Sequence, residues 1–313
     1  MRCIFTFMDI KISLSSQNSN LICYCISYFK NYFNCFDEEN GEVTMSVDII
    51  DHSNVGNNYV LETKLPFKVF IHKYDKKMVL TGVKDENCHE LMRLIRELFV
   101  YYISTSKKCS FFHAACVTNN KYAVAITGNK FAGKTTMCFN FLRNGWNFIS
   151  NDKLILEKNE RNEIICWGLP IALGVREGTK QIFTKELDGL AIDSKDNRYY
   201  LSPNQLIERF NIRVVNKQQL KLILVPVFCP EAQKINCEKI EINEVLSILK
   251  NQSLESFSIN RKNIKSLKTQ SNYSFINCLC KIPVYRILIN TELNYQFKKT
   301  IEKIIKQEVN QYD

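Results

Sequence analysis

The sequence predicts an α/β protein whose main domain contains a mixed sheet and is preceded by a small β-rich region. Three observations support this fold class. A glycine-containing loop at 128–135 joins an apolar strand pattern to a helix pattern. An amphipathic helix pattern covers 86–106, and short strand-and-turn patterns fill 1–85. We therefore expect two domains, 1–85 and 86–313.

Length, composition and charge are those of a folded protein with acidic partners. The chain has 313 residues, 45% hydrophobic and 24% charged, which is enough for one large domain or two ordinary ones. The formal charge of +10 favours acidic partners such as nucleotide phosphates. The alternative is that the positive charge simply reflects a composition rich in Lys and Asn. No basic stripe with interleaved aromatic residues stands out, so we expect no nucleic-acid partner.

The cysteines and the N-terminus favour a cytoplasmic protein. The 13 cysteines include no C-x-x-C pair, and their odd number without a secretion signal indicates reduced thiols. The opening "MRCIFTFMDIKISL" is interrupted by charges and is not a signal peptide. The apolar stretch 21–29 is too short to span a bilayer, so we expect no membrane partner.

The elements follow from local patterns along the chain. Leu21 to Phe36 is ambiguous, whereas the stripe in 86–106 has the spacing of a helix that packs on a sheet or another helix. Two strands joined at Asn119-Asn120 are expected in 109–128, and a helix over 134–144 ends at Gly145. Further predictions are a hairpin turning at 159–162, strands at 220–228 and 283–289, a helix around 243–250 and a C-terminal amphipathic helix.

The loop fits G-x-x-x-x-G-K-[ST], the phosphate-binding pattern, in its expected strand–loop–helix context. Glycines let the backbone N–H groups point at phosphates, and the following helix adds a positive N-terminus. Lys134 can bridge β- and γ-phosphates, and the Thr135 hydroxyl can ligate Mg²⁺. The alternative is a simple glycine turn before a helix. The predicted nucleotide-binding residues are Gly128, Asn129, Lys130, Phe131, Ala132, Gly133, Lys134, Thr135 and Thr136.

The stretch from 109 to 157 resembles the kinase domain of HPr kinase/phosphorylase and its peptide-kinase relatives. The matching positions are His113-Ala114-Ala115, the loop, Arg143-Asn144-Gly145 and Ser150-Asn151-Asp152. The resemblance implies a phosphoenolpyruvate carboxykinase-like fold and ATP- and Mg²⁺-dependent phosphorylation of a serine. It also implies a peptide or small-protein acceptor, such as a ribosomally made peptide precursor, and often a homo-oligomer.

Four residues are candidates for catalysis: Asp152, His113, Lys134 and Arg176. Asp152 can ligate Mg²⁺ or orient the nucleophile, and its alternative is a turn carboxylate. His113 is either a site residue, as the resemblance implies, or a satisfied core histidine. Arg176 can stabilise the transferred phosphoryl group, or it is a surface arginine.

The chain departs from the family pattern at two positions. Asn151 stands where an aspartate is usual, and an amide cannot accept a proton as a base. Gly174-Val175 stands where the family has a glutamate. If the missing aspartate is the base, the protein is slow, uses Asp152 or His113 instead, or has lost catalysis, and Glu157 and Glu177 are possible replacements. Two alternatives to a serine kinase therefore remain. One is a catalytically weak or inactive nucleotide-binding regulator or peptide-binding protein, and the other is a different reaction on the same scaffold.

Overall fold

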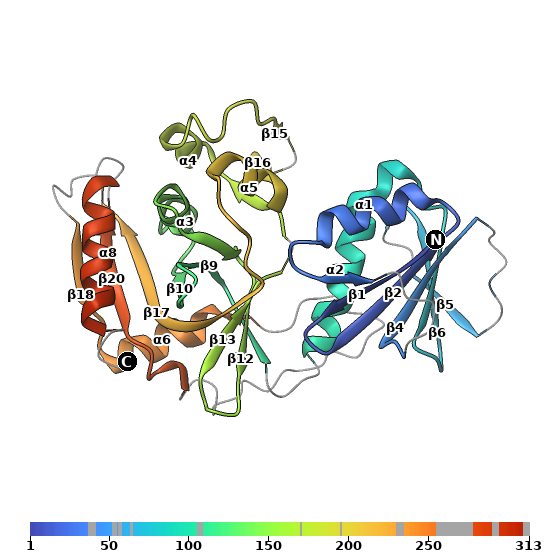
Figure 1. Ribbon diagram of the computed structural model, residues 1–313, viewed down its shortest axis with the longest axis horizontal. Helices are drawn as coiled ribbons and strands as arrows, with labels where there is room; N and C mark the ends of the chain where they lie inside the picture. Colours follow the sequence, from blue (N-terminus) through green and yellow to red (C-terminus); the bar gives the residue numbers. More distant parts are fainter. Residues whose placement is uncertain are drawn as a thin grey trace. The chain divides into compact units, whose positions relative to one another are not determined.

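The computed structural model divides the chain into two compact units, with a boundary along the chain after residue 106 (Figure 1). The sequence placed this boundary at residue 85, whereas the helix that follows residue 85 belongs to the first unit. The structure describes residues 1–36, 42–51, 55, 58–62, 65–104, 109–169, 171–194, 196–229, 235–254, 278–289 and 294–308.

The first unit contains a mixed sheet in the order β3-β1-β2-β4-β7-β6-β5. Its central pairs, β2 with β4 and β4 with β7, are parallel, and the outer pairs are antiparallel. The chain reverses between the first two strands at Met8, which has a left-handed backbone. The strands are β1 (Arg2–Phe7), β2 (Ile10–Ser16), β3 (Asn34–Phe36), β4 (Met45–Ile50), β5 (Tyr59–Glu62), β6 (Lys68–His72) and β7 (Lys77–Thr81).

Two helices pack on this sheet. The ambiguous segment forms α1 (Ser19–Phe29), whose first turn is capped by the Asn18 side chain, and then leads to β3. A short 3₁₀ turn, η1 (Asp85–Asn87), precedes α2 (Cys88–Ser104), which contacts α1 and β2. The expected apolar stripe of α2 is confirmed as core, since these members are buried: Leu91, Leu94, Ile95, Leu98, Phe99 and Ile103.

The second unit contains a larger mixed sheet, consistent with the predicted α/β class. The strand order is β11-β9-β10-β17-β13-β12-β8-β19, with β20 on β17 and β18 on β20. Only the β10–β17 and β17–β20 pairs among these described strands are parallel. The strands are β8 (Cys109–Phe112), β9 (Ala114–Thr118), β10 (Ala123–Thr127), β11 (Asn147–Ser150), β12 (Leu154–Lys158), β13 (Ile164–Trp167), β17 (Lys217–Phe228), β18 (Asn236–Lys239), β19 (Ser253–Leu254) and β20 (Val284–Ile289).

Helices cover both faces of this sheet. The helix after the glycine loop, α3 (Lys134–Arg143), packs on β9, β10, β11 and β17 and touches the C-terminal helix α8 (Asn294–Glu308). The Phe141 and Phe297 rings form that contact, with centroids 4.9 Å apart. On the other side, Val245 of α6 (Ile242–Gln252) joins a core containing Ala123 and Ala125.

A smaller layer stands beside α3. It consists of a sheet in the order β14 (Leu173–Val175), β16 (Arg198–Leu201) and β15 (Ile192–Asp193), with α4 (Glu177–Ile182) and α5 (Pro203–Phe210). Aromatic rings join this layer to α3, because Phe139 contacts both Phe183 and Phe210. The layer thereby forms a wall opposite the glycine loop.

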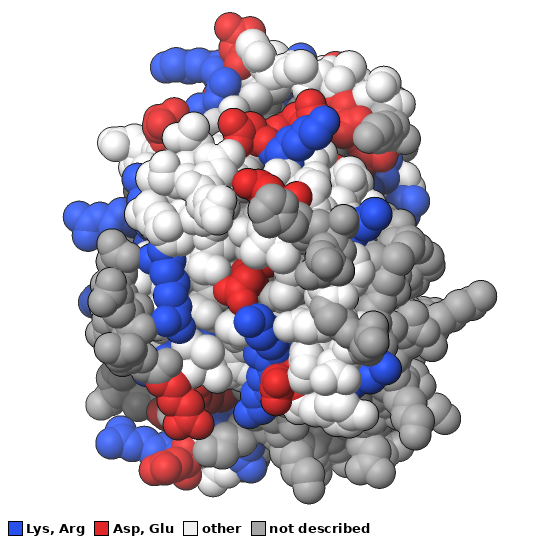
Figure 2. Space-filling model, turned by 90° about the vertical axis from the view of Figure 1, so that its right-hand side faces the viewer, with Lys and Arg blue, Asp and Glu red and all other residues white. Residues whose placement is uncertain are grey.

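The surface carries charges of both signs. On the face shown in Figure 2, basic and acidic side chains are interspersed among uncharged ones. All thirteen cysteines are free thiols. In the part of the chain that the structure describes, none of the helices combines the length and the apolar character needed to cross a bilayer.

Candidate functional site

Two strand breaks at the same level of the sheet bring His113 and Asp152 together. The segment 109–118 was expected as one strand, but at His113 it divides into β8 and β9. Its neighbour divides likewise into β11 and β12, with Asp152 between them. The registers Cys116↔Ser150 and Phe112↔Leu154 bracket both breaks, so the two interruptions face each other.

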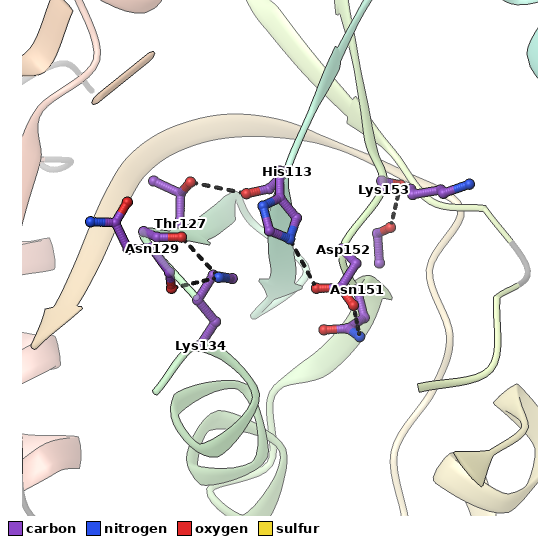
Figure 3. A network of polar contacts seen from close by, with 9 residues as sticks. His113, Thr127, Asn129, Lys134, Asn151, Asp152 and Lys153 are labelled. Atoms are coloured by element: carbon purple, nitrogen blue, oxygen red, sulfur yellow. Dashed lines mark hydrogen bonds and ion pairs between the residues drawn. The ribbon is translucent and has the colours of Figure 1, made fainter. Parts of the chain in front are cut away.

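His113 and Asp152 form an ion pair, drawn in Figure 3, with 3.4 Å between His113 Nε2 and Asp152 Oδ1. Asp152 lies at the tip of a tight turn with a left-handed backbone, φ 60°. The Ser150 hydroxyl closes this turn by donating to the Lys153 carbonyl at 2.7 Å. The Thr127 hydroxyl donates to the His113 carbonyl at 3.0 Å, which ties the histidine to the strand that leads into the loop.

The environment keeps Asp152 ionised. Burial would raise the pKa of its carboxyl, but the hydrogen bond from His113 and the charges of His113, Lys134 and Arg198 together lower the pKa below its ordinary value. Asn151, itself buried, donates its side-chain amide to Asp152 Oδ2 at 3.3 Å. This turn therefore presents one stable carboxylate with an amide beside it, not a pair of adjacent carboxylates.

The glycine loop has the backbone of a phosphate cradle. Positive φ angles occur at Gly128 (143°), Phe131 (71°) and Gly133 (93°), and such alternation turns successive N–H groups toward a common point. Gly133 begins α3 without a side-chain cap, so no side chain competes for the helix's first N–H groups. Both features favour an anion at this end of α3.

Lys134 is held within the loop. Its ammonium donates to the carbonyls of Gly128 at 2.8 Å and Asn129 at 3.0 Å, as Figure 3 shows. Burial lowers the pKa of Lys134, and the nearby Asp152 charge opposes that shift. A polyphosphate in the loop would supply the negative charge that this buried ammonium favours.

The opposite wall supplies Arg176 and Glu177. Arg176 precedes α4 and stacks on the Phe131 ring, with 4.7 Å from its Cζ to the ring centroid. The hydroxyls of Thr136 and Thr179 are 2.9 Å apart and link the first turn of α3 to α4. The structure thus brings Arg176 to the same cavity as the loop.

Most of the predicted site residues line this cavity of about 1140 Å³. Gly128 and Asn129 are not on its lining, and they contribute instead the carbonyls that hold Lys134. The predicted residues on the lining are His113, Lys130, Phe131, Ala132, Gly133, Lys134, Thr135, Thr136, Asp152 and Arg176.

Sequence reasoning missed Arg198, which also lines the cavity and whose charge contributes to the lowered pKa of Asp152. The β14–β16 pairing brings it there, and a Cβ on Gly174 would lie only 3.3 Å from Arg198 Nη1. Glycine at 174 therefore leaves room for this arginine. That glycine is the one local signal of the arrangement.

The two glutamates predicted as replacements for the acidic residue missing at position 151 differ in position. Glu177 lines the cavity and accepts a hydrogen bond from the Tyr199 hydroxyl at 2.6 Å. Glu157 is not on the lining and accepts from the Trp167 indole at 2.8 Å. Among the described residues, Glu177 is thus the better placed of the two.

The lining combines four cations with two carboxylates and an imidazole, a composition suited to a polyphosphate and a divalent cation. No cluster of three or more His, Cys, Asp or Glu side chains that could hold a metal occurs in the described residues. Mg²⁺ is commonly held by one or two carboxylates together with substrate phosphates. Thr135 and Asp152 both line the cavity and provide oxygen ligands of that kind.

Comparison with known proteins gives one distant likeness to report. No family profile matches the chain, and no curated protein matches it. Among solved structures, the HPr(Ser) kinase/phosphatase from Coxiella burnetii is similar over 64% of this chain and 95% of its own, with 15% identity and a TM-score of 0.28.

Proposed function

We propose that the chain is an ATP- and Mg²⁺-dependent kinase that phosphorylates a serine of a peptide or small protein. The observation that carries this proposal is the placement of the His113–Asp152 pair and of Lys134 on one cavity, beside a glycine loop at a helix N-terminus. A mixed sheet around the loop accords with a phosphoenolpyruvate carboxykinase-like domain, and free cysteines accord with a cytoplasmic setting.

Binding would use the loop. Its backbone N–H groups and Lys134 contact the phosphates, while Thr135 and Asp152 hold Mg²⁺. Magnesium supplies charge neutralisation at the β- and γ-phosphates when it is bound. Arg176 and Arg198 stand on the cavity wall, where they can stabilise charge on the group being transferred.

Transfer would form a bond between the serine Oγ and the γ-phosphorus and break the bond to the β–γ bridging oxygen, releasing ADP. The serine proton must leave in the same step. Because its pKa is lowered, Asp152 is a poor general base. It is better suited to hold a metal ion or to accept a hydrogen bond. Asp152 would therefore orient the hydroxyl, and the adjacent His113, in its neutral form, would receive the proton.

The direct test is incubation of the full chain with Mg²⁺, ATP and candidate serine peptides, followed by mass spectrometry. The expected product carries one phosphoryl group on a serine. We expect His113→Gln to lower the transfer rate roughly 100-fold or more while ATP still binds, as is usual for loss of a general base. Absence of transfer to every candidate peptide, with ATP bound, would count against a kinase.

A second candidate function is nucleotide binding without efficient transfer. Asn151 favours it, because the buried amide beside Asp152 cannot accept a proton. Asn151→Asp would place two carboxylates together, which raises the pKa of one of them and creates a better base. A large gain of transfer activity in this variant, over a nearly inactive wild type, would support the second candidate.

A further inference from the structure

An exposed phenylalanine lies on the lining of the cavity. Phe228 is the last residue of β17, is 45% exposed and lines the same cavity as the glycine loop. The strand runs parallel to β10, which leads into the loop, with Ile126 paired to Leu224. Both strands therefore end at the same edge of the sheet, where ligands of α/β proteins commonly bind.

The end of β17 lies directly beside the loop. A Cβ on Gly128 would be 3.7 Å from Val225 Cγ1 and 3.9 Å from the Pro226 carbonyl oxygen. At the other end of the loop, a Cβ on Gly133 would be 3.4 Å from Ile289 Cδ1. Ile289 is the register partner of Phe228 in the β17–β20 pair. Phe228 is thus paired with Ile289, the β20 residue that lies beside Gly133 at the start of α3.

The other exposed aromatic ring on the cavity lining, Phe131, makes cation–π contacts with two basic side chains. Lys130 Nζ lies 5.2 Å and Arg176 Cζ 4.7 Å from its centroid. The Phe228 ring has no aromatic or cationic partner within the described part of the chain. It is an apolar ring on a cavity whose other lining residues are mostly of polar or charged types.

We propose that Phe228 is the stacking platform for the nucleobase of the bound nucleotide. The inference rests on the proposed nucleotide binding and adds the subsite that distinguishes a nucleotide from a bare polyphosphate. With its phosphates in the loop, a nucleotide projects its base away from α3, and Phe228 offers a planar apolar surface beside the loop. Aromatic stacking suits any nucleobase, including the adenine of ATP, because every base presents a π-face.

The experiment compares ATP with inorganic tripolyphosphate, each with Mg²⁺, by calorimetry on the full chain. Phe228→Ala should weaken ATP binding on the order of 10-fold and leave tripolyphosphate binding unchanged, because stacking acts on the base alone. Phe228→Trp should restore ATP affinity. Phe36→Ala is a matched control, since Phe36 also ends a strand and is 47% exposed, but belongs to the first unit.

The outcomes separate this inference from the function on which it rests. If wild type binds both ligands and Phe228→Ala weakens neither, or weakens both equally, Phe228 does not stack on the base and contacts the phosphates or an acceptor instead. If wild type binds neither ligand, both the stacking and the nucleotide-binding proposal are overturned. Circular dichroism and the Tm of each variant check that the fold is intact.

Discussion

At the scale of single residues, Lys134 is the cation on which phosphate binding should depend. Lys134→Met should weaken both ATP and tripolyphosphate roughly 10- to 100-fold, the range for a lost charged hydrogen bond. The Tm should change little, because removal of a buried charge whose pKa is lowered by burial is stabilising, whereas loss of the hydrogen bonds to the Gly128 and Asn129 carbonyls is destabilising. Calorimetry and thermal unfolding measure the two effects.

Lys121, exposed in the turn between β9 and β10, supplies the control. Lys121→Met removes the same charge from the chain and should leave both affinities unchanged. Equal losses in the two lysine variants would mean that net charge, not the position of Lys134, attracts the phosphates.

The His113–Asp152 pair makes a prediction about pH. Because the folded protein lowers the pKa of Asp152 from 3.8, this carboxylate contributes stability above pH 3.8 that is lost as the pH falls through the lowered value. His113→Gln removes the hydrogen bond and the charge that contribute most to lowering the pKa of Asp152, so its titration midpoint should rise. Carbon NMR of the carboxyl group measures the midpoint, and an unchanged value would exclude the coupling.

Local motifs predicted some site residues and missed others for a physical reason. The loop is a contiguous pattern, and His113 and Asp152 each end a recognisable apolar stretch. Arg198 has no such context, because a pairing between two short strands brings it to the cavity. The role of Gly174 is likewise visible only once the Arg198 side chain beside it is known.

At the scale of elements, α3 is joined to the opposite wall by an ion pair at its C-terminal end. Arg143 donates from two nitrogens to Glu186, both at 2.8 Å, and stacks on the Phe183 ring. Burial alone would raise the pKa of Glu186, but Arg143 outweighs it and the pKa is lowered. This contact fixes the distance between the loop helix and the segment that carries Arg176.

Arg143→Met should lower the free energy of unfolding by about 1 kcal/mol at neutral pH, the upper range for a partly exposed pair. Since Glu186 has a lowered pKa, its contribution is present above its ordinary pKa of 4.5 and is lost as the pH falls through the lowered value. The difference between wild type and variant should therefore shrink on acidification. Urea unfolding at several pH values measures it, and a pH-independent difference would assign the loss to ring stacking.

The positions of helices and strands along the chain could be predicted better than the elements with which they pair. Both expected hairpins form, with left-handed backbones at Asn120 and Asn162, and α6, α8, β17 and β20 lie where their patterns indicated. The break at His113 was not expected, because the residues on either side of it are apolar and suit a strand. Pairing with β12 on one side and with β10 and β11 on the other imposes the break.

At the scale of the whole molecule, the α/β class and the mixed sheet follow from the alternation of strand and helix patterns. The domain boundary does not follow from these patterns. The sequence of an amphipathic helix indicates that one of its faces is buried, but it does not indicate which element the helix packs against. The stripe of α2 packs against α1 and β2, which assigns that helix to the first unit. Every residue of the candidate site belongs to the second unit.

This division predicts that residues 107–313 bind nucleotide without the first unit. The fragment keeps its own core, the loop and both walls of the cavity, so its affinity for ATP should stay within about threefold of the full chain's. Transfer to a peptide should fall more than ATP affinity does if the first unit recognises the acceptor. Calorimetry and phosphopeptide mass spectrometry on the fragment and the full chain separate the two effects. A folded fragment that has lost ATP binding would show that the first unit contributes to the nucleotide site itself.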